Sequence, residues 1–448
     1  MLRRLEELPS VWRYCVVALL GIGLWFVLRW IDDESDVPHV AIHLKLKPGG
    51  ALHEPSQQLF SHHPADALAR WRKLGVPANQ VDHELAALAA DPAVEEAFVE
   101  PTVSLPSLPS LPSGPAARDG DSCPITTPSY SEHQGYLDPA PGGIDAPAAW
   151  RLNARGAGVQ FADIEGGWNA NHEDLPGDRI THIAGAMIND PSWRAHGTAV
   201  LGEVVGRDNG KGVTGIAPDV DHIYTSSIGS QDVAEAIDAA AAQLHAGDVL
   251  LIELQGGGPR GRYVPMEYWD DNYDAIRAAT DRGVVVIEAA GNGNEDLDLA
   301  VFKRKFDRTF RDSGAILVGA GGPPRAGYRD REKLDFSNYG SRVDVQGWGR
   351  KVATLDYGDL QKCTGEDRHY TDRHYTGEFS GTSSASPIVA GAAILVEGVA
   401  HMKGTTLAPR AVRTLLHDTG SPQQGSTKQQ IGPRPDLSRA VAALGYAW

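Results

Sequence analysis

Three segments of the sequence carry residues of catalytic type beside glycines. They begin at His196 (HGTAVLGEVVG), Glu288 (EAAGNGNED) and Phe379 (FSGTSSASPIVAGAAILVEGVA). The third is a glycine-rich turn with several serines that leads into a strongly apolar helix. A serine in the first turn of a helix has unpaired backbone N–H groups beside it and lies at the positive end of the helix dipole. An oxyanion formed there would meet a hydrogen-bond donor, as acyl transfer requires.

Each segment also has an ordinary structural explanation when it is taken alone. The serine turn fits a Ser or Thr N-cap before a buried helix. His196 precedes Gly-Thr and a second apolar helical stretch, where a histidine commonly caps or packs. Asn292 follows the apolar run GVVVIEA, at the strand end where ligand sites of open α/β sheets gather, although an Asn-Gly turn explains it too. The segments therefore indicate chemistry only in combination.

Two carboxylates precede the three segments, in the stretch GVQFADIEGGWNANHEDL that begins at Gly158. Asp163 and Glu165 are two residues apart in a strand-like run. Because side chains alternate along a strand, both lie on the same face and are near neighbours. Either one is a candidate for a catalytic acid.

The elements that must position these residues alternate along the chain from about Gly120 onward. Helical stretches, among them 230–247 and 273–283, separate short apolar runs. These runs lack the alternation of a half-buried strand, as expected where both faces of a sheet are buried: GVQFADI, DHIYTSSI, DVLLIEL, GVVVIEA and GAILVGA. This order is typical of a mostly parallel α/β sheet with helices on both faces.

Residues 37–103 form a smaller unit, which we predict to be an α+β domain. The runs 40–49 (VAIHLKLKPG) and 93–101 (AVEEAFVEP) alternate as half-buried strands do. Between them, 65–75 and 81–92 have helical spacing.

A threefold Ser-Leu-Pro repeat follows this unit. Because dense proline excludes helices and sheet ladders, we predict an extended linker at 104–119 and a large domain at 120–448.

An uncharged apolar run, YCVVALLGIGLWFVL, lies near the N-terminus between Arg13 and Arg29. As a helix it rises about 22 Å, less than the roughly 30 Å of a membrane core. Both arginines can extend to the interfaces, so we predict a transmembrane signal anchor at 11–31. The positive-inside rule places residues 1–10 in the cytoplasm and the rest in the periplasm or outside the cell, because arginines precede the run and DDESD follows it. The alternative is a cleaved signal peptide, but no small-x-small cleavage site follows the run.

The charge and the cysteines exclude other classes of protein. A formal net charge of −17 argues against a nucleic-acid partner, because phosphates need a clustered basic surface. The three cysteines, Cys15, Cys123 and Cys363, lack the Cys-x-x-Cys spacing of zinc or thioredoxin-type sites. Cys123 and Cys363 are candidates for one disulfide outside the cytoplasm.

Together the segments resemble the subtilisin-like (S8) serine peptidases. HGTAVLG resembles the family's His-Gly-Thr-x-Val-x-Gly block, AAGNGN its Ala-Ala-Gly-Asn block and SGTSSASPIVAG its Gly-Thr-Ser-x-Ala-x-Pro block, and their order agrees. The resemblance covers roughly 120–448 and implies a subtilisin-like three-layer fold. It implies that His196 is the general base and that Asn292 is the side-chain donor of the oxyanion site. The frame of the last block selects Ser383 as the nucleophile among four serines: Ser380, Ser383, Ser384 and Ser386.

The acid departs from the family pattern. In the family it ends a strand, is followed by a small residue and glycine, and precedes a His-x-Asp-Leu turn. Here that turn is HEDL, which begins at His172, and the frame places the acid at Glu165, before Gly166 and Gly167. The family's acid is normally Asp, so Asp163 is the alternative. Glu also serves in serine hydrolases on other folds, and the two glycines permit the backbone retreat that its extra methylene needs.

The stretch IELQGGGP lies where the family has its substrate-pairing strand. The resemblance implies that Gln255, Gly256 and Gly257 line the cleft and pair with an extended peptide backbone, with Gly256 leaving the cleft wall open. Asp174 and Asn209 fall where some members supply calcium ligands, but two oxygens are far short of the six to eight that calcium takes. We predict no metal ligands and no required cofactor.

The unit at 37–103 resembles the family's inhibitor-like propeptides through LKLKPG and DPAVEEAFVEP. This implies a ferredoxin-like domain that assists folding and then blocks the cleft as an intramolecular inhibitor. The alternative is a plain accessory domain.

We therefore predict a membrane-anchored serine endopeptidase that hydrolyses protein or peptide substrates through an acyl-enzyme at Ser383. The alternative is a catalytically silent peptide-binding module of the same fold, which the unusual Glu165 motivates. A third reading is an intact enzyme that its N-terminal domain blocks until another protease cuts the linker.

Overall fold

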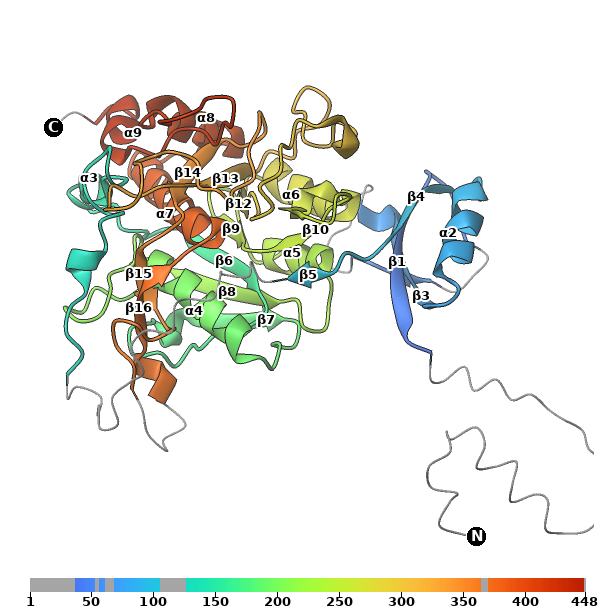
Figure 1. Cartoon of the computed structure of the whole chain (residues 1–448), viewed down its shortest axis with the longest axis horizontal. Helices are drawn as coiled ribbons and strands as arrows, with labels where there is room; N and C mark the ends of the chain where they lie inside the picture. The colour runs from blue at the N-terminus through green and yellow to red at the C-terminus, as the bar shows by residue number, and fades with distance from the viewer. Residues whose placement is uncertain (1–36, 53–55, 61–67, 105–125, 364–369, 447–448) are drawn as a thin grey trace, which may run out of the picture.

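The computed structural model of this chain describes residues 37–52, 56–60, 68–104, 126–363 and 370–446. The predicted segments 1–10 and 11–31, and almost all of the predicted linker, lie outside the described residues. The described chain forms a small N-terminal domain, blue in Figure 1, beside a large domain.

A sheet of seven parallel strands forms the centre of the large domain, in the order β14-β13-β12-β9-β6-β8-β7. The five predicted strands are all present: β6 (Gln160–Glu165), β8 (His222–Ser227), β9 (Val249–Ile252), β12 (Val285–Ala289) and β13 (Ile316–Gly321). β7 (Ile180–Ala184) and β14 (Val345–Trp348) form its edges. β6 lies beside β9, where the strand order reverses, so its carboxyl end is at a position typical of ligand sites.

Helices cover both faces of this sheet (Figure 1). They are α4 (Pro191–Val205) and α7 (Thr382–His401) on one face, and α5 (Val233–Ala241) and α6 (Asp270–Asp281) on the other. Val285 and Ile287 of β12 enter the core that contains α4 and α7, whereas Val286 enters the opposite core. Because both faces are buried, the strands are apolar without alternation, and the predicted three-layer α/β fold is confirmed.

Smaller elements complete the large domain. They are α3 (Ala146–Trp150), α8 (Pro409–Thr419), α9 (Leu437–Ala443), and the paired strands β15 (Val352–Leu355) and β16 (Tyr375–Phe379). Among the described residues, α7 is the one helix long and apolar enough to cross a membrane, and its apolar stretch is entirely buried inside the protein. Here α7 is a core helix, and the predicted anchor at 11–31 stays a prediction.

The N-terminal domain is an antiparallel four-stranded sheet with one described α-helix, α2 (Val81–Ala90), and a short 3-10 helix at Leu68–Arg70. The strands are β1 (His39–Leu46), β2 (Gln57–Gln58), β3 (Trp71–Pro77) and β4 (Val94–Val99). Their order, β2-β3-β1-β4, is that of a ferredoxin-like unit, as predicted.

The predicted helix at 65–75 is wrong, because residues 71–77 form β3. β3 pairs with β1 over seven residues, which satisfies its backbone hydrogen bonds in the sheet. Trp71 is also fully buried, and its indole N–H donates to Asp274 of α6 at 2.9 Å. Contacts outside the segment therefore overrode its helical spacing.

The strand that follows the N-terminal domain pairs with a strand of the large domain. β5 (Val103–Ser104) pairs antiparallel with β10 (Gln255–Gly257), which also pairs with β11 (Tyr263–Pro265). In Figure 1, β5 extends from the blue domain toward β10. The predicted boundary between domain and linker, at 103 and 104, therefore falls inside a strand.

Candidate active site

Ser383 is the second residue of α7. The helix begins at Thr382, and its N-cap, Gly381, has φ 110° and ψ −178°, a conformation that favours glycine. The side chain of Ser383 is fully buried, and its Oγ has no hydrogen bond with any described residue. The helix N-terminus thus presents a serine hydroxyl beside the backbone N–H groups of the first helical turn.

His196 lies in the second turn of α4, and α4 packs against α7. Its Nδ1 is 2.5 Å from Glu165 Oε2, and its Nε2 is buried without a hydrogen bond to a described residue. The ring also meets Phe379 edge to face, with 5.5 Å between ring centroids. Because Phe379 ends the strand that leads to Ser383, the histidine lies close to the serine turn.

Glu165 ends β6 and has both carboxylate oxygens in use. Oε1 accepts the Gly166 backbone N–H at 2.8 Å, and Oε2 accepts from His196. The residue after the histidine must be small, because a Cβ at Gly197 would lie 2.8 Å from Glu165 Cγ. Gly166 and Gly167 are not among the glycines with positive φ. Gly166 instead provides space for Trp193, whose ring would lie 2.4 Å from a Cβ there.

Asp163 has a different partner. Its Oδ2 accepts the Trp168 indole N–H at 2.7 Å, and its Oδ1 has no hydrogen bond to a described residue. Burial, and then the charge of Glu165, raises the pKa of Asp163 well above its usual value. The structure therefore separates the two sequence candidates: Glu165 contacts His196, and Asp163 contacts Trp168.

Two further buried carboxyl groups, which sequence reasoning missed, lie in this part of the core. Burial raises the pKa of Glu203, on α4, well above its usual value. Burial also raises the pKa of Glu253, and the charges of Asp163, Glu165 and Glu203 raise it further. Only their apolar sequence surroundings could have indicated them.

Asn292 follows β12 and is oriented by the serine turn. Its Oδ1 accepts both the backbone N–H and the Oγ1–H of Thr382 at 2.9 Å, which leaves Nδ2 as a donor. A Cβ at Gly381 would lie 3.1 Å from Asn292 Nδ2, 3.4 Å from the Ser383 backbone nitrogen and 3.8 Å from Ser383 Oγ. The two donors and the hydroxyl thus surround one position, which Gly381 keeps open. Sequence reasoning did not single out Gly381, although it lies in the Gly-Thr-Ser block.

The predicted substrate strand is present as β10, but its side chains differ from expectation. Gln255 is 1% exposed, and its Oε1 accepts the Asn292 backbone N–H at 2.8 Å, so this side chain supports the asparagine loop. The prediction that Gly256 leaves the cleft wall open is wrong, because a Cβ there would meet the Trp269 ring at 2.3 Å. A Cβ at Gly257 would meet no atom within 4 Å. The backbone of β10 is occupied by β5, with Ser104 opposite Gln255 and Val103 opposite Gly256.

Asp174 and Asn209 bond to each other. Asn209 Nδ2 donates to Asp174 Oδ1 at 2.8 Å, and the Val213 backbone N–H donates to Asp174 Oδ2 at the same distance. Both carboxylate oxygens are used within the protein.

Cys363 takes part in a disulfide. Cys15 and Cys123 lie outside the described residues, so the predicted pairing with Cys123 stays a prediction.

Comparisons with known proteins agree on one family. The sequence profile described as "Subtilase family" (Peptidase_S8) matches residues 164–433, more than half of the chain. An intracellular serine protease of Paenibacillus polymyxa is 29% identical over 276 residues, which cover 58% of this chain and 72% of the relative. The major intracellular serine protease of Bacillus subtilis is 26% identical over 270 residues, with 57% and 73% covered.

Solved structures show the same fold. A protease of Pseudoalteromonas arctica superposes with a TM-score of 0.51 at 23% identity, covering 71% of this chain and 99% of that chain. The epidermin leader peptide processing serine protease of Staphylococcus aureus superposes with a TM-score of 0.60 at 15% identity, covering 92% and 99%.

Proposed function

Because this chain belongs to the subtilase family, we propose that it is a serine endopeptidase that hydrolyses peptide bonds of proteins or peptides. The observation that carries the proposal is the 2.5 Å contact between His196 Nδ1 and Glu165 Oε2, with His196 on a helix that packs against the helix whose first turn holds Ser383. A family member that had lost its activity would have no need to keep this contact, the serine and the asparagine donor together.

In the proposed mechanism, Ser383 Oγ attacks the substrate carbonyl while His196 Nε2 takes its proton, and an acyl-enzyme forms as the amine leaves with that proton. Water then releases the acyl group by the same route. Both Oγ and Nε2 are without another hydrogen-bond partner among the described residues, so each is available to the other once substrate orders the site.

Glu165 acts through His196. Its carboxylate accepts the Nδ1–H, which fixes the tautomer with a basic Nε2, and it stabilises the imidazolium that forms. Asn292 Nδ2 and the Ser383 backbone N–H donate to the oxyanion, in the space that Gly381 leaves open. No metal or cofactor takes part in these steps.

The N-terminal domain acts as an intramolecular inhibitor in this proposal. β5 adds to β10 as an extended peptide adds to a sheet edge, so residues 103 and 104 occupy the backbone of the proposed substrate strand. A substrate cannot pair with β10 until β5 leaves. We therefore expect the full chain to be inactive until it is cut within the predicted linker.

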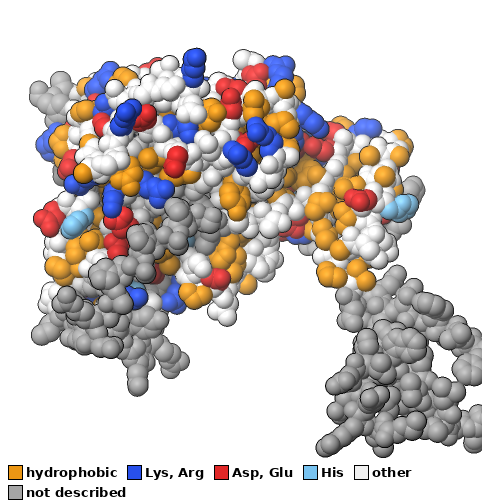
Figure 2. Space-filling model, in the orientation of Figure 1, with side chains coloured by type: hydrophobic (Ala, Val, Ile, Leu, Met, Phe, Trp, Pro, Cys, Tyr) orange, Lys and Arg blue, Asp and Glu red, His pale blue; other side chains and the backbone are white. Residues whose placement is uncertain are grey.

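We also propose that the large domain lies outside the cytoplasm, held at a cell membrane by residues 11–31. The disulfide at Cys363 supports this location, because disulfides persist in oxidising compartments. Figure 2 shows basic side chains interspersed with acidic ones over the visible face of the large domain. With a net charge of −17, we expect no nucleic-acid partner.

A fluorophosphonate probe tests the proposed activity. The parent protein and Ser383→Ala are labelled both intact and after the linker is nicked, and the labelled residue is mapped by mass spectrometry. We expect label on Ser383 of the nicked parent and none on the variant. Absence of label in both forms of folded parent protein would favour the silent peptide-binding module.

A further inference from the structure

A second buried histidine lies where the two domains meet. His43, on β1, is fully buried, and its Nδ1 is 2.7 Å from Oδ2 of Asp271 at the start of α6. The other oxygen of Asp271 accepts the Asn272 backbone N–H at 2.7 Å, which fixes this carboxylate. Since Nδ1–H donates to Asp271, Nε2 is the ring atom available to a ligand.

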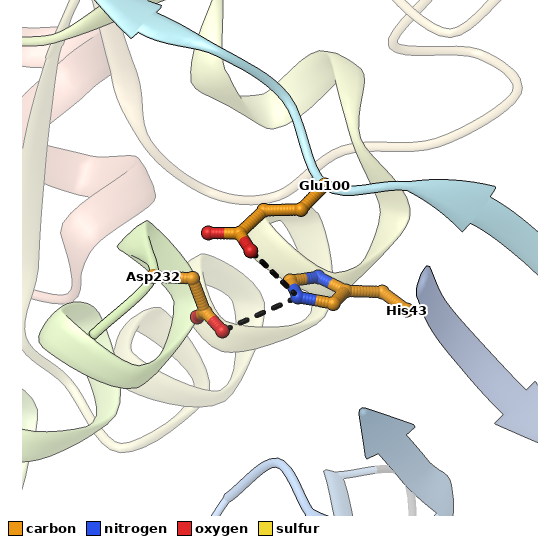
Figure 3. Close-up of side chains that lie close together, drawn as sticks. All are labelled: His43, Glu100 and Asp232. Carbon is orange, nitrogen blue, oxygen red and sulfur yellow. Dashed lines mark ion pairs between the residues drawn. The ribbon is translucent and has the colours of Figure 1, made fainter. Parts of the chain in front are cut away.

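Two carboxylates, one from each domain, point toward His43 Nε2 (Figure 3). Asp232 Oδ2 lies at 3.3 Å and Glu100 Oε2 at 3.8 Å. Asp232 is the N-cap of α5 and uses Oδ1 for the Glu235 backbone N–H at 2.8 Å, so Oδ2 is the oxygen that faces the histidine. The three potential ligand atoms lie within 4.8 Å of one another.

The ring atom that faces the two carboxylates is buried. This atom, Nε2, has no hydrogen bond of good geometry to a described residue, although Asp232 Oδ2 lies 3.3 Å from it. A cavity of about 10 Å³ adjoins the three side chains, roughly the space of one water molecule.

We propose that His43, Glu100 and Asp232 bind a divalent transition cation of the zinc class, which joins the N-terminal domain to the large domain. Tetrahedral zinc with one imidazole and two carboxylates places its ligand atoms about 3.4 Å apart. The separations from Nε2 here are 3.3 and 3.8 Å, and Glu100 is 32% exposed and able to close the remaining distance. Asp271 orients the imidazole, as carboxylates do behind metal-bound histidines.

Lys73 competes with the cation for the same oxygens. Its Nζ is 3.1 Å from Asp232 Oδ2 and 3.8 Å from Glu100 Oε2. Glu235 Oε2, at 3.7 Å, offers this ammonium another partner when it moves aside. Removal of the ammonium with Lys73→Leu is therefore expected to strengthen cation binding, whereas a purely structural cluster would gain nothing from this change.

The test counts metal in the full chain carrying Ser383→Ala, which keeps the protein intact and makes the result independent of the proposed peptidase activity. We expect one equivalent of Zn²⁺ after dialysis, and tetrahedral Co²⁺ absorption when cobalt replaces zinc. His43→Gln should lose this equivalent, and His83→Gln, an exposed histidine on α2, should keep it. Retention of the equivalent in His43→Gln overturns the proposal. Absence of bound zinc from the parent also overturns the proposal, and His43 and Lys73 are then the cations of the cluster.

Two further variants carry the test if His43→Gln does not fold. Asp271→Asn should weaken zinc binding about 10- to 100-fold, because it changes only the residue behind the histidine. Lys73→Leu should tighten it. Unchanged affinity in both variants overturns the proposal, whatever the outcome of probe labelling at Ser383.

Discussion

Two histidines of this chain each have a carboxylate at Nδ1 and a buried Nε2. His196 is 2% exposed and His43 is fully buried. Nδ1 of each contacts a carboxylate, at 2.5 Å from Glu165 and 2.7 Å from Asp271, and Nε2 of each is buried without a hydrogen bond to a described residue. The carboxylate behind each ring fixes the ring's orientation and leaves Nε2 for other chemistry.

The two histidines differ in the chemical group that faces Nε2. At His196 the proposed partner is a serine hydroxyl, a group that can give up a proton to the ring. At His43 the neighbours are two carboxylates, which favour a cation. A histidine backed by a carboxylate is therefore not in itself a catalytic base, because the group in front of the ring decides its chemistry.

The largest expected effect separates the two acids near His196. Glu165→Gln should lower kcat about 10⁴-fold, because an amide cannot stabilise the imidazolium and favours the wrong tautomer. Asp163→Asn should change kcat by less than about 10-fold, since Asn still accepts from Trp168. Peptide hydrolysis by linker-nicked protein gives both values. A larger loss in Asp163→Asn would make Asp163 the orienting acid.

The next effect concerns the oxyanion donor. Asn292→Ala should lower kcat about 10²- to 10³-fold with little change in KM, because Nδ2 acts on charge that develops in the transition state. Asn209→Ala, which removes an asparagine bonded to Asp174, is the matched control. A rise in KM with unchanged kcat would instead place Asn292 in substrate binding.

A third experiment compares how much each histidine contributes to holding the N-terminal domain on the large domain. After the linker is nicked, His43→Gln should weaken retention of the N-terminal domain by about 100-fold or more, because removal of one partner leaves buried carboxylates uncompensated. His196→Gln should leave retention unchanged. Gel filtration of the nicked proteins measures the bound fraction. Equal retention in both variants would show that the cluster does not hold the domains together.

The smallest effect is on stability. Because burial raises the pKa of Asp163 in the folded state, its carboxyl group loses its proton at a higher pH there than in the unfolded chain, where it does so near about pH 4. A group with a raised folded pKa contributes stability at low pH that is lost as the pH rises toward the folded pKa. Asn cannot release a proton, so the Tm of Asp163→Asn relative to the parent should rise between pH 5 and pH 8, by a few °C. A pH-independent difference would contradict a protonated Asp163.

The strands of the parallel sheet were predictable because the residue pattern that specifies each strand lies within a few consecutive residues. Each of the five predicted strands is an apolar run bounded by turn residues. Because both faces of the sheet are buried, these runs need no alternation of apolar and polar residues. The segment 65–75 failed for the opposite reason. Its spacing is compatible with a helix, and only pairing with β1 and the burial of Trp71 against α6 make it a strand.

The site residues divide in the same way. The resemblance of short blocks pointed to Ser383, His196 and Asn292, and the turn at HEDL pointed to Glu165 rather than Asp163. The supporting role of Gln255 and the position that Gly381 keeps open were not predictable, because they depend on how separate loops approach one another.

The sequence by itself determined the family, the strand order along the chain and the types of catalytic residue, since these depend on short motifs and hydrophobic patterns. The tertiary structure alone decided which acid contacts His196, how β5 covers β10, and that His43, Glu100 and Asp232 meet. Residues far apart in the chain become neighbours only when burial of apolar surface brings their elements together. Partners that depend on such packing leave no local pattern in the sequence.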